Sequence, residues 1–541
     1  MSRFFEKASF FKTAAALLLA LAVLLTGLLS GCSKGPKLPP MPDPINDNYR
    51  VVYQIFVGSF SDSDGDGKGD LQGIINRLDY LNDGDINNGD DLGVQLLWLS
   101  PIFVSPTYHK YDTVDYYRID PDFGTEETLK NLVDKCHQRN VKVILDIALN
   151  HTSNINKDFQ KFLAAHNNGD TSDPYYDRYS WVDADGKKNG VRYALLGKSG
   201  QFYECNFDNA MPELNYDVPE VREEMFNVLK YYLDLGIDGF RFDAAKYIYY
   251  GDTAKNIEYW KELLEKLREV KPDVYTVGEV WSGNTEVVQY YEALNCFDFT
   301  AAAPDGMIAA AANGKNGQID NYTKYVCAFL NQIDGKGGRA DVMYQPFIAN
   351  HDMDRAGGFL TVSTGAAQMG ANILLLAPGS PVIYYGEEIG MKGSRGASNT
   401  DANRRLAMLW GDGDTVKDPQ GSTFEASKQV NGTVSDQLAN KNSLLRHYEK
   451  VIALRNKYPQ IARGNYTQID FESKFAGGFD VEYEGAHIGI IHNTSNVEAE
   501  LDLSEYKGYE FKTLLDFAGT GTAKLSGTKL TIGPKTSAIV G

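Results

Sequence analysis

Apolar residues alternate along the chain between short runs and amphipathic stretches, from Val51 to about Tyr458. The intervening stretches carry apolar residues at helical spacing, such as the stripe from Leu71 to Leu81 and the segment that Pro219 begins and Gly236 ends. Eight strands separated by helices predict an α/β fold, a (β/α)₈ TIM barrel, better than an open sheet. The strand-like runs are 51–57, 94–99, 141–147, 237–243, 274–279, 296–299, 345–349 and 381–385.

Two parts of the chain depart from this alternation. Residues 151–215 separate the third and fourth predicted strands and are rich in Asn, Asp, Gly and Tyr, which predicts a small inserted domain, domain B. After about Tyr458 the segments become short and alternating, as in Ala486–His492 and Thr528–Ile532, which predicts a C-terminal all-β sandwich over 458–541. The catalytic barrel is therefore assigned to 49–150 and 216–457.

The N-terminus has the pattern of a secretory signal peptide, with basic residues followed by an apolar run over 14–29. A run of this length could also be an uncleaved membrane helix. The next residues, Leu29-Ser30-Gly31-Cys32, resemble a bacterial lipobox and favour cleavage after 31 with a lipid attached to Cys32. We expect a signal peptide over 1–31, a lipidated, proline-rich tether over 32–48, and an exported protein anchored to the outer side of the cytoplasmic membrane.

Composition narrows the choice of partners. The 541 residues include 53 Lys and Arg against 72 Asp and Glu, a formal net charge of −19. An acidic surface repels phosphate backbones, so nucleic-acid binding is not expected, whereas a neutral ligand and a cation suit it. Five cysteines are too few for a disulfide scaffold, and the four beyond Cys32 are expected to be buried free thiols.

Polar residues follow four of the predicted strands. Because the carboxyl ends of barrel strands meet at one mouth, these residues should converge there. They are Asp146 on the third strand with Asn150 and His151 just after it, Arg241 and Asp243 on the fourth, Glu279 at the end of the fifth, and His351 and Asp352 just after the seventh.

The segments around these residues resemble the signature regions of the α-amylase family of glycoside hydrolases, in the order that the family has them. They are Asp146-Ile-Ala-Leu-Asn150-His151, Gly239-Phe-Arg241-Phe-Asp243, Gly278-Glu279-Val-Trp and Asn350-His351-Asp352. Further matches are Gly93–Pro101, Met211-Pro-Glu-Leu-Asn215 and Gly379–Glu387, the second being typical of members intermediate between the oligo-1,6-glucosidase and neopullulanase groups. The resemblance spans roughly 49–455 and implies a retaining hydrolase of α-glucosidic bonds on a TIM barrel.

The resemblance also implies the catalytic roles. Retention requires an ionised carboxylate at the anomeric carbon and a protonated carboxyl beside the leaving oxygen. Asp243 would be the nucleophile, Glu279 the general acid and then base, and Asp352 the third acid, which binds sugar hydroxyls. Arg241 lies two residues before Asp243 and so on the same strand face, where its charge should keep Asp243 ionised. Asp146 is assigned mainly to structure.

Four more residues would bind the sugar at the cleaved bond. By the resemblance, Tyr111 stacks on the ring, Asp112 helps to bind it, and His151 and His351 donate hydrogen bonds to it. Together with Arg241 they form the predicted substrate site. Taken singly, each of them could equally be a structural residue, so the prediction depends on the set.

A second constellation has the alternating acids that a hard cation needs. In Asp62-Ser-Asp64-Gly-Asp66-Gly-Lys68-Gly-Asp70 the four acids and the backbone carbonyl of Lys68 resemble the calcium loop after the first strand of α-amylase relatives. A solvated acidic turn is the alternative. The usual Lys-His after the nucleophile is Lys246-Tyr247 here, so a second calcium near Asn150 is in doubt.

Three activities remain open. We expect an endo-acting α-amylase that cleaves α-1,4 bonds in starch, maltodextrins and maltooligosaccharides. An exo-acting α-glucosidase or a transglycosylase on short oligosaccharides is the alternative, and an inactive sugar-binding homologue is a remote one, since all three acids are present. The sequence does not indicate product length, branch tolerance or oligomeric state.

Overall fold

The structure is a computed structural model that describes residues 47–85, 89 and 91–541. The predicted signal peptide, Cys32 and nearly all of the tether lie outside the described residues. Within them, no helix is both long enough and apolar enough to cross a membrane.

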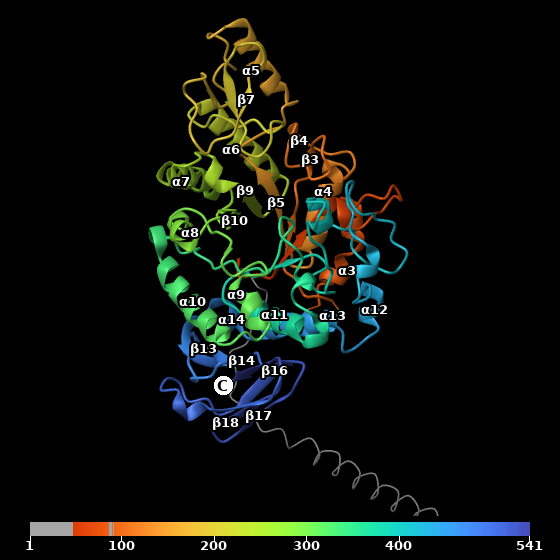
Figure 1. Ribbon diagram of the computed structural model, residues 1–541, viewed down its shortest axis with the longest axis vertical. Coiled ribbons are helices and arrows are strands. Elements are labelled where there is room, and N and C mark those ends of the chain that lie inside the picture. The colour runs from red at the N-terminus through yellow and green to blue at the C-terminus, as the bar shows by residue number, and fades with distance from the viewer. Residues whose placement is uncertain (1–46, 86–88, 90) are drawn as a thin grey trace, which may run out of the picture. The chain divides into compact units, whose positions relative to one another are not determined.

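A parallel sheet with the strand order β10-β9-β5-β2-β1-β11 forms most of the barrel wall (Figure 1). Three isolated parallel bridges continue it from β10 back to β11: Gly278 with Cys296, Phe297 with Gln345, and Phe347 with Val382. The sheet therefore closes through two short strand segments near 296 and 345, and all eight predicted strands take part in a TIM barrel. The named strands are β1 (Val52–Ile55), β2 (Leu96–Leu99), β5 (Lys142–Ala148), β9 (Gly239–Asp243), β10 (Tyr275–Gly278) and β11 (Val382–Tyr384).

Helices follow the strands and cover the outside of the barrel (Figure 1). Those before residue 300 are α2 (Leu71–Asn76), α3 (Leu78–Leu81), α4 (Glu126–His137), α6 (Pro219–Asp234), α7 (Thr253–Val270) and α8 (Asn284–Tyr290). Those after it are α9 (Met307–Ala312), α10 (Gln318–Ile333), α11 (Ala366–Leu375), α12 (Val434–Leu438), α13 (Leu444–Lys457) and α14 (Pro459–Arg463).

Two helix ends follow from local sequence, and one prediction needs correction. Pro219 stands at the first position of α6, where its missing N–H costs nothing, and Gly236 just beyond its end has φ +102°. The stripe from Leu71 to Leu81 is not one helix but two, because Arg77 between them leaves helical geometry. Its guanidinium is held by Asp412 and Asp414.

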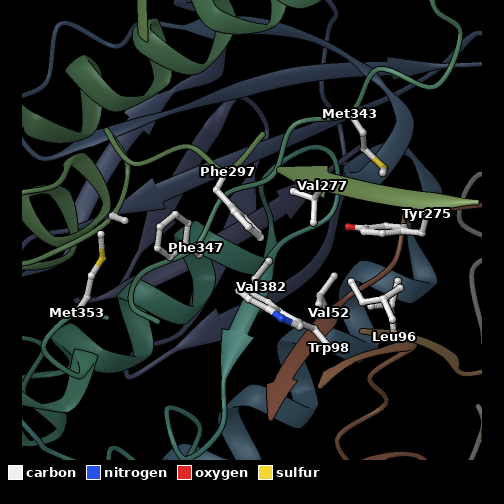
Figure 2. Packing of buried hydrophobic residues seen from close by; sticks show 12 residues of the cluster. Val52, Leu96, Trp98, Tyr275, Val277, Phe297, Met343, Phe347, Met353 and Val382 are labelled. Atoms are coloured by element: carbon white, nitrogen blue, oxygen red, sulfur yellow. The ribbon is translucent and has the colours of Figure 1, made fainter. Parts of the chain in front are cut away.

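The barrel interior is packed with apolar side chains from several strands. Trp98 of β2 stacks on Phe297 with ring centroids 5.2 Å apart, and Val52 and Val382 pack into the same cluster. Figure 2 shows Trp98, Val52, Val382 and Phe297 converging from different strands. The barrel is thus a filled core, and a cavity can form only beyond the carboxyl ends of its strands.

Two segments are inserted between elements of the barrel. Residues 151–215 contain α5 (Lys157–Asn168) and a three-stranded antiparallel sheet of β6 (Trp181–Val182), β8 (Phe202–Glu204) and β7 (Tyr193–Leu195). A hairpin of β3 (Phe103–Val104) and β4 (Asp115–Ile119) precedes them.

The chain after α14 forms two antiparallel sheets and one short 3-10 helix, Leu503–Glu505. One sheet has the order β12-β13-β14-β19-β16 and the other β15-β18-β17, with a common apolar core. The strands are β12 (Asn465–Ile469), β13 (Ala476–Tyr483), β14 (Ala486–Asn493), β15 (Ala499–Asp502), β16 (Leu514–Gly519), β17 (Ala523–Ser526), β18 (Lys529–Ile532) and β19 (Thr536–Val540).

Four cysteines occur among the described residues, and all four are free thiols. Cys136, Cys205 and Cys296 are buried, as expected, whereas Cys327 on α10 is partly exposed.

Candidate active site

Three carboxylates line one cavity at the carboxyl ends of the barrel strands. Asp243 is the last residue of β9, Glu279 follows β10, and Asp352 follows the strand segment near 345. All three belong to the wall of a cavity of about 970 Å³. Parallel strands that end at the same edge bring together residues more than a hundred positions apart, so the predicted convergence is found in the structure.

One arginine, Arg241, contacts two of these acids, Asp243 and Glu279, together with Asp146. The fully buried guanidinium of Arg241 donates from Nη1 to Asp146 Oδ1 at 2.7 Å and to Asp243 Oδ1 at 2.6 Å. Its Nη2 forms an ion pair with Glu279 Oε1 at 3.2 Å. The other Glu279 oxygen accepts a hydrogen bond from the backbone N–H of Ala244 at 3.0 Å. Asp243 and Glu279 therefore lie on neighbouring nitrogens of one rigid group.

The three cavity acids differ in acidity. Burial raises the pKa of Asp243 to about 6, although Arg241 opposes the shift. Burial raises the pKa of Glu279 further, to about 7, and Arg241 opposes it there too. Burial would also raise the pKa of Asp352, but His351, Arg405 and Arg241 outweigh it and hold that pKa well below its usual range. Glu279 is thus the acid that keeps its proton to the highest pH.

Two of the predicted sugar-binding residues face the cavity. Tyr111 lines it, and its hydroxyl donates to Asp146 at 2.9 Å. His151 also lines it, with Nδ1 2.9 Å from Asn150 Oδ1 and Nε2 without a partner. Burial lowers the pKa of His151 to about 4, so its ring is neutral near pH 7. Its one N–H, on Nδ1, donates to Asn150 Oδ1, and Nε2 is left as an acceptor.

The other three predicted binders lie behind the cavity wall. Asp112 accepts hydrogen bonds from the hydroxyls of Ser105, at 2.7 Å, and Thr107. His351 is fully buried, and both its ring nitrogens contact protein groups, which leaves no free donor for a sugar. Together with Arg241, these residues are placed to orient the side chains that do line the cavity.

Sequence reasoning missed the charged wall of the cavity. Arg405 binds Asp352 Oδ1 at 2.7 Å and the Tyr108 hydroxyl at 3.0 Å, and Arg404 binds the Asp352 carbonyl at 2.7 Å. Arg395 and Asp401 add a two-bond ion pair in the same wall. The pair Arg404-Arg405 follows the last barrel strand by about twenty residues, and no spacing rule indicated that the loop returns to the cavity.

Aromatic side chains line the same cavity as Glu279. Trp281, two residues on, lines the cavity, is 47% exposed and stacks on Phe299 with centroids 4.9 Å apart. Phe207 of the inserted segment and Tyr247 also line it, and their centroids are 4.7 Å apart. The general acid must lie beside the leaving group, so Trp281, two residues from Glu279, would face the leaving-group side.

The predicted calcium loop is partly assembled. Asp62, Asp64 and Asp70 bring carboxylate oxygens within 4.8 Å of one another. Asp66 is not in this group, since its carboxylate accepts from the Lys68 backbone N–H at 2.7 Å, and the Lys68 ammonium binds Asp122 at 2.7 Å. Three converging carboxylates are the donors that Ca²⁺ prefers, so the residues fit such an ion.

Comparisons with known proteins agree with this geometry. The family model described as alpha amylase, catalytic domain, matches residues 54–464. "Alpha-amylase 3" of Dictyoglomus thermophilum is 35% identical over 87% of this chain and 88% of its own, and a "4-alpha-glucanotransferase" of Thermotoga neapolitana is 30% identical over 77% and 90%. Among solved structures, Amy13B of Eubacterium rectale aligns with a TM-score of 0.83 and 32% identity, over 91% of this chain and 95% of its own.

Proposed function

This chain belongs to the α-amylase family of glycoside hydrolases, and we propose that it is an endo-acting α-amylase that cleaves α-1,4-glucosidic bonds in starch, maltodextrins and maltooligosaccharides with retention. The observation that carries the proposal is the placement of Asp243, Glu279 and Asp352 in one cavity of about 970 Å³. That volume is at the upper end for ligand sites, which run from about 300 to 1,000 Å³, and leaves room for more than one sugar unit.

The reaction begins with proton transfer from Glu279 to the glycosidic oxygen while a carboxylate oxygen of Asp243 attacks the anomeric carbon. The bond to the leaving sugar breaks, and a covalent glycosyl ester forms on Asp243. Glu279, now ionised, removes a proton from a water molecule, which attacks the same carbon and frees Asp243. Asp352 binds hydroxyls of the same sugar and favours its distorted, positively charged transition state.

A second candidate activity is transfer of the glycosyl group to another sugar. It is supported by the aromatic side chains of Trp281, Phe207 and Tyr247, which line the same cavity as Glu279. Flat rings bind sugar faces and would hold an acceptor sugar in the cavity, where its hydroxyl could attack in place of water. The relative from Thermotoga neapolitana carries the name of a glucanotransferase. An exo-acting α-glucosidase remains a third possibility with the same acids.

One product experiment separates these activities. Purified protein is incubated with soluble starch and with maltoheptaose, and iodine colour, reducing ends and product lengths are followed over time. Endo-cleavage predicts a rapid loss of iodine colour at few reducing ends. Glucose as the sole early product would indicate exo-cleavage, products longer than maltoheptaose would indicate transfer, and sugar binding without turnover would indicate an inactive homologue. Asp243→Asn serves as the inactive control.

We also propose that Asp62, Asp64 and Asp70 hold a structural Ca²⁺. The ion would offset the repulsion among three carboxylates and fix the turn between β1 and α2. It would play no part in bond cleavage.

The lipid anchor at Cys32 and the location on the outer side of the cytoplasmic membrane are likewise proposals. They rest on the signal-like N-terminus, the Leu29-Ser-Gly-Cys32 sequence and the proline-rich segment that follows.

A further inference from the structure

Gln54 is a buried polar residue that the reaction described above does not use. It lies in the middle of β1, between the strands β2 and β11, and its side chain is fully inaccessible to solvent. Its amide nitrogen Nε2 is 2.6 Å from Nδ1 of His351. Its amide oxygen Oε1 is buried without a hydrogen-bond partner. A barrel core would be better filled here by an apolar side chain, so the amide calls for a reason beyond packing.

The contact with Gln54 determines which nitrogen of His351 carries the proton. An amide nitrogen can only donate, so Nδ1 of the ring accepts and the ring proton resides on Nε2. Nε2 faces two oxygens: Oδ2 of Asp352 at 2.9 Å and the Tyr111 hydroxyl at 2.6 Å. The Tyr111 hydroxyl gives its own proton to Asp146, so it too can accept from His351. With the proton on Nε2, Nδ1 of His351 therefore has a donor and its Nε2–H has an acceptor.

The opposite tautomer of His351 would create two unfavourable contacts. With the proton on Nδ1, two donors would face each other across 2.6 Å at Gln54. The lone pair of Nε2 would face the Asp352 carboxylate across 2.9 Å. Since His351 is fully buried, no solvent can reach the ring to relieve either contact.

We propose that Gln54 is a positioning residue: by donating to Nδ1 of His351 it fixes the Nε2–H tautomer, and His351 then donates to Asp352 and aims its carboxylate into the cavity. Gln54 touches no substrate and acts only through His351. The inference rests on the glycosidase function proposed above and adds a residue of the first barrel strand to the machinery behind Asp352.

The test uses Gln54→Met, which keeps length and volume but cannot donate. It removes the unpaired amide oxygen but leaves Nδ1 of His351 without a donor, and these two effects oppose each other, so we expect the melting temperature to stay level. We expect kcat/KM on maltoheptaose to fall by about 10- to 100-fold, mainly through kcat, as is typical when an orienting partner is lost. A loss of activity together with unchanged or higher stability is a result that a purely structural role cannot produce.

Gln345→Met is the matched control. Gln345 is a second fully buried barrel glutamine, whose oxygen accepts from the Tyr275 hydroxyl at 2.8 Å. None of its described contacts reaches His351, so its replacement should leave kcat/KM within about twofold of the wild type. An equal loss in both variants would show that any buried glutamine matters for folding alone and would overturn the proposal.

The tautomer can be read directly in the unmodified protein. The chain has eight histidines, and comparing ¹⁵N-histidine spectra of the wild type and His351→Asn identifies the His351 signals. We expect one protonated nitrogen, Nε2, and an unprotonated Nδ1 that shifts in Gln54→Met. A protonated Nδ1 in the wild type, or wild-type kcat/KM in Gln54→Met, would overturn the inference. Absence of wild-type turnover would instead count against the proposed function, while the spectra would still test the tautomer.

Discussion

Asp146→Asn should move one limb of the pH–activity profile and leave the other in place. Asp146 is fully buried and binds Arg241, Tyr111 and the Trp98 indole N–H. Its charge is one cause of the raised pKa of Asp243, whereas the raised pKa of Glu279 arises from burial, Asp243 and Asp352. Asparagine keeps the size and an acceptor oxygen but removes the charge.

The size of the effect follows from the shared arginine. Oxygens of Asp146 and Asp243 contact the same Nη1 of Arg241 at 2.7 and 2.6 Å. They are therefore no more than about 5 Å apart, where two like charges at an effective dielectric constant of about 20 repel by about 3 kcal/mol, or about two pKa units. Removing the charge should lower the pKa of Asp243 from about 6 to between about 4 and 5.

The assay is kcat/KM against pH on a maltooligosaccharide, from about pH 3.5 to 9. The acid limb reports the ionisation of the nucleophile and the alkaline limb the loss of the proton from the general acid. We expect the acid limb to shift down by one to two units and the alkaline limb, near pH 7, to stay within about half a unit. Asp298→Asn is the control, since Asp298 is a buried carboxylate held by Tyr325 and Tyr344 away from the cavity wall. A folded, active Asp146→Asn enzyme with an unmoved acid limb would refute the reasoning.

Four more predictions follow from the same residues and from the N-terminal segment. Asp243→Asn should lower kcat by at least about 1,000-fold with an unchanged circular dichroism spectrum, and near-normal turnover would remove its role as nucleophile. Glu279→Gln should be more stable than the wild type at pH 8, by up to about 3 kcal/mol, but not at pH 4. The wild type loses stability as pH rises from 4.5 to 7, because Glu279, with a pKa near 7 in the folded protein, ionises there at a cost to the native state. Equal melting temperatures of the two proteins at pH 8 would contradict this. A chelator should lower the melting temperature and added Ca²⁺ should restore it, through the loop Asp62–Asp70, whereas an unchanged melting curve with no bound metal on elemental analysis would discard the ion. Cys32→Ser should release the protein from membranes, and unaltered fractionation would rule out the anchor.

The barrel was predictable because each of its strands is short, apolar and bounded by polar residues. The runs at 296–299 and 345–349 form only isolated bridges in the structure, yet the pattern of alternation required them for closure. The apolar stripe around Arg77 predicted a single helix where the structure has two, because apolar periodicity reports only the buried face of a segment. At this break Arg77 forms ion pairs with Asp412 and Asp414, more than three hundred residues away, which no local pattern indicates.

The site was predictable where function depends on strand ends and unpredictable where it depends on returning loops. Asp243 and Glu279 follow strands, so their convergence follows from topology alone. Arg405 reaches Asp352 from a loop whose path no local pattern encodes. His351 and Asp112 belong to the predicted motifs, but a motif does not tell whether a side chain lines a cavity or supports one that does.

The charges around Arg241 explain why Asp243 is suited to be the nucleophile and Glu279 the general acid. Three carboxylates, Asp146 among them, contact this single buried cation. One positive charge does not balance three negative ones, so a proton is most favoured on the carboxylate that the cation holds least tightly. The proton should remain where the contact with the cation is weakest, and that is Glu279, at 3.2 Å, rather than Asp243, at 2.6 Å. The general acid is thus protonated because the arginine is shared, and the same sharing keeps the nucleophile ionised beside it.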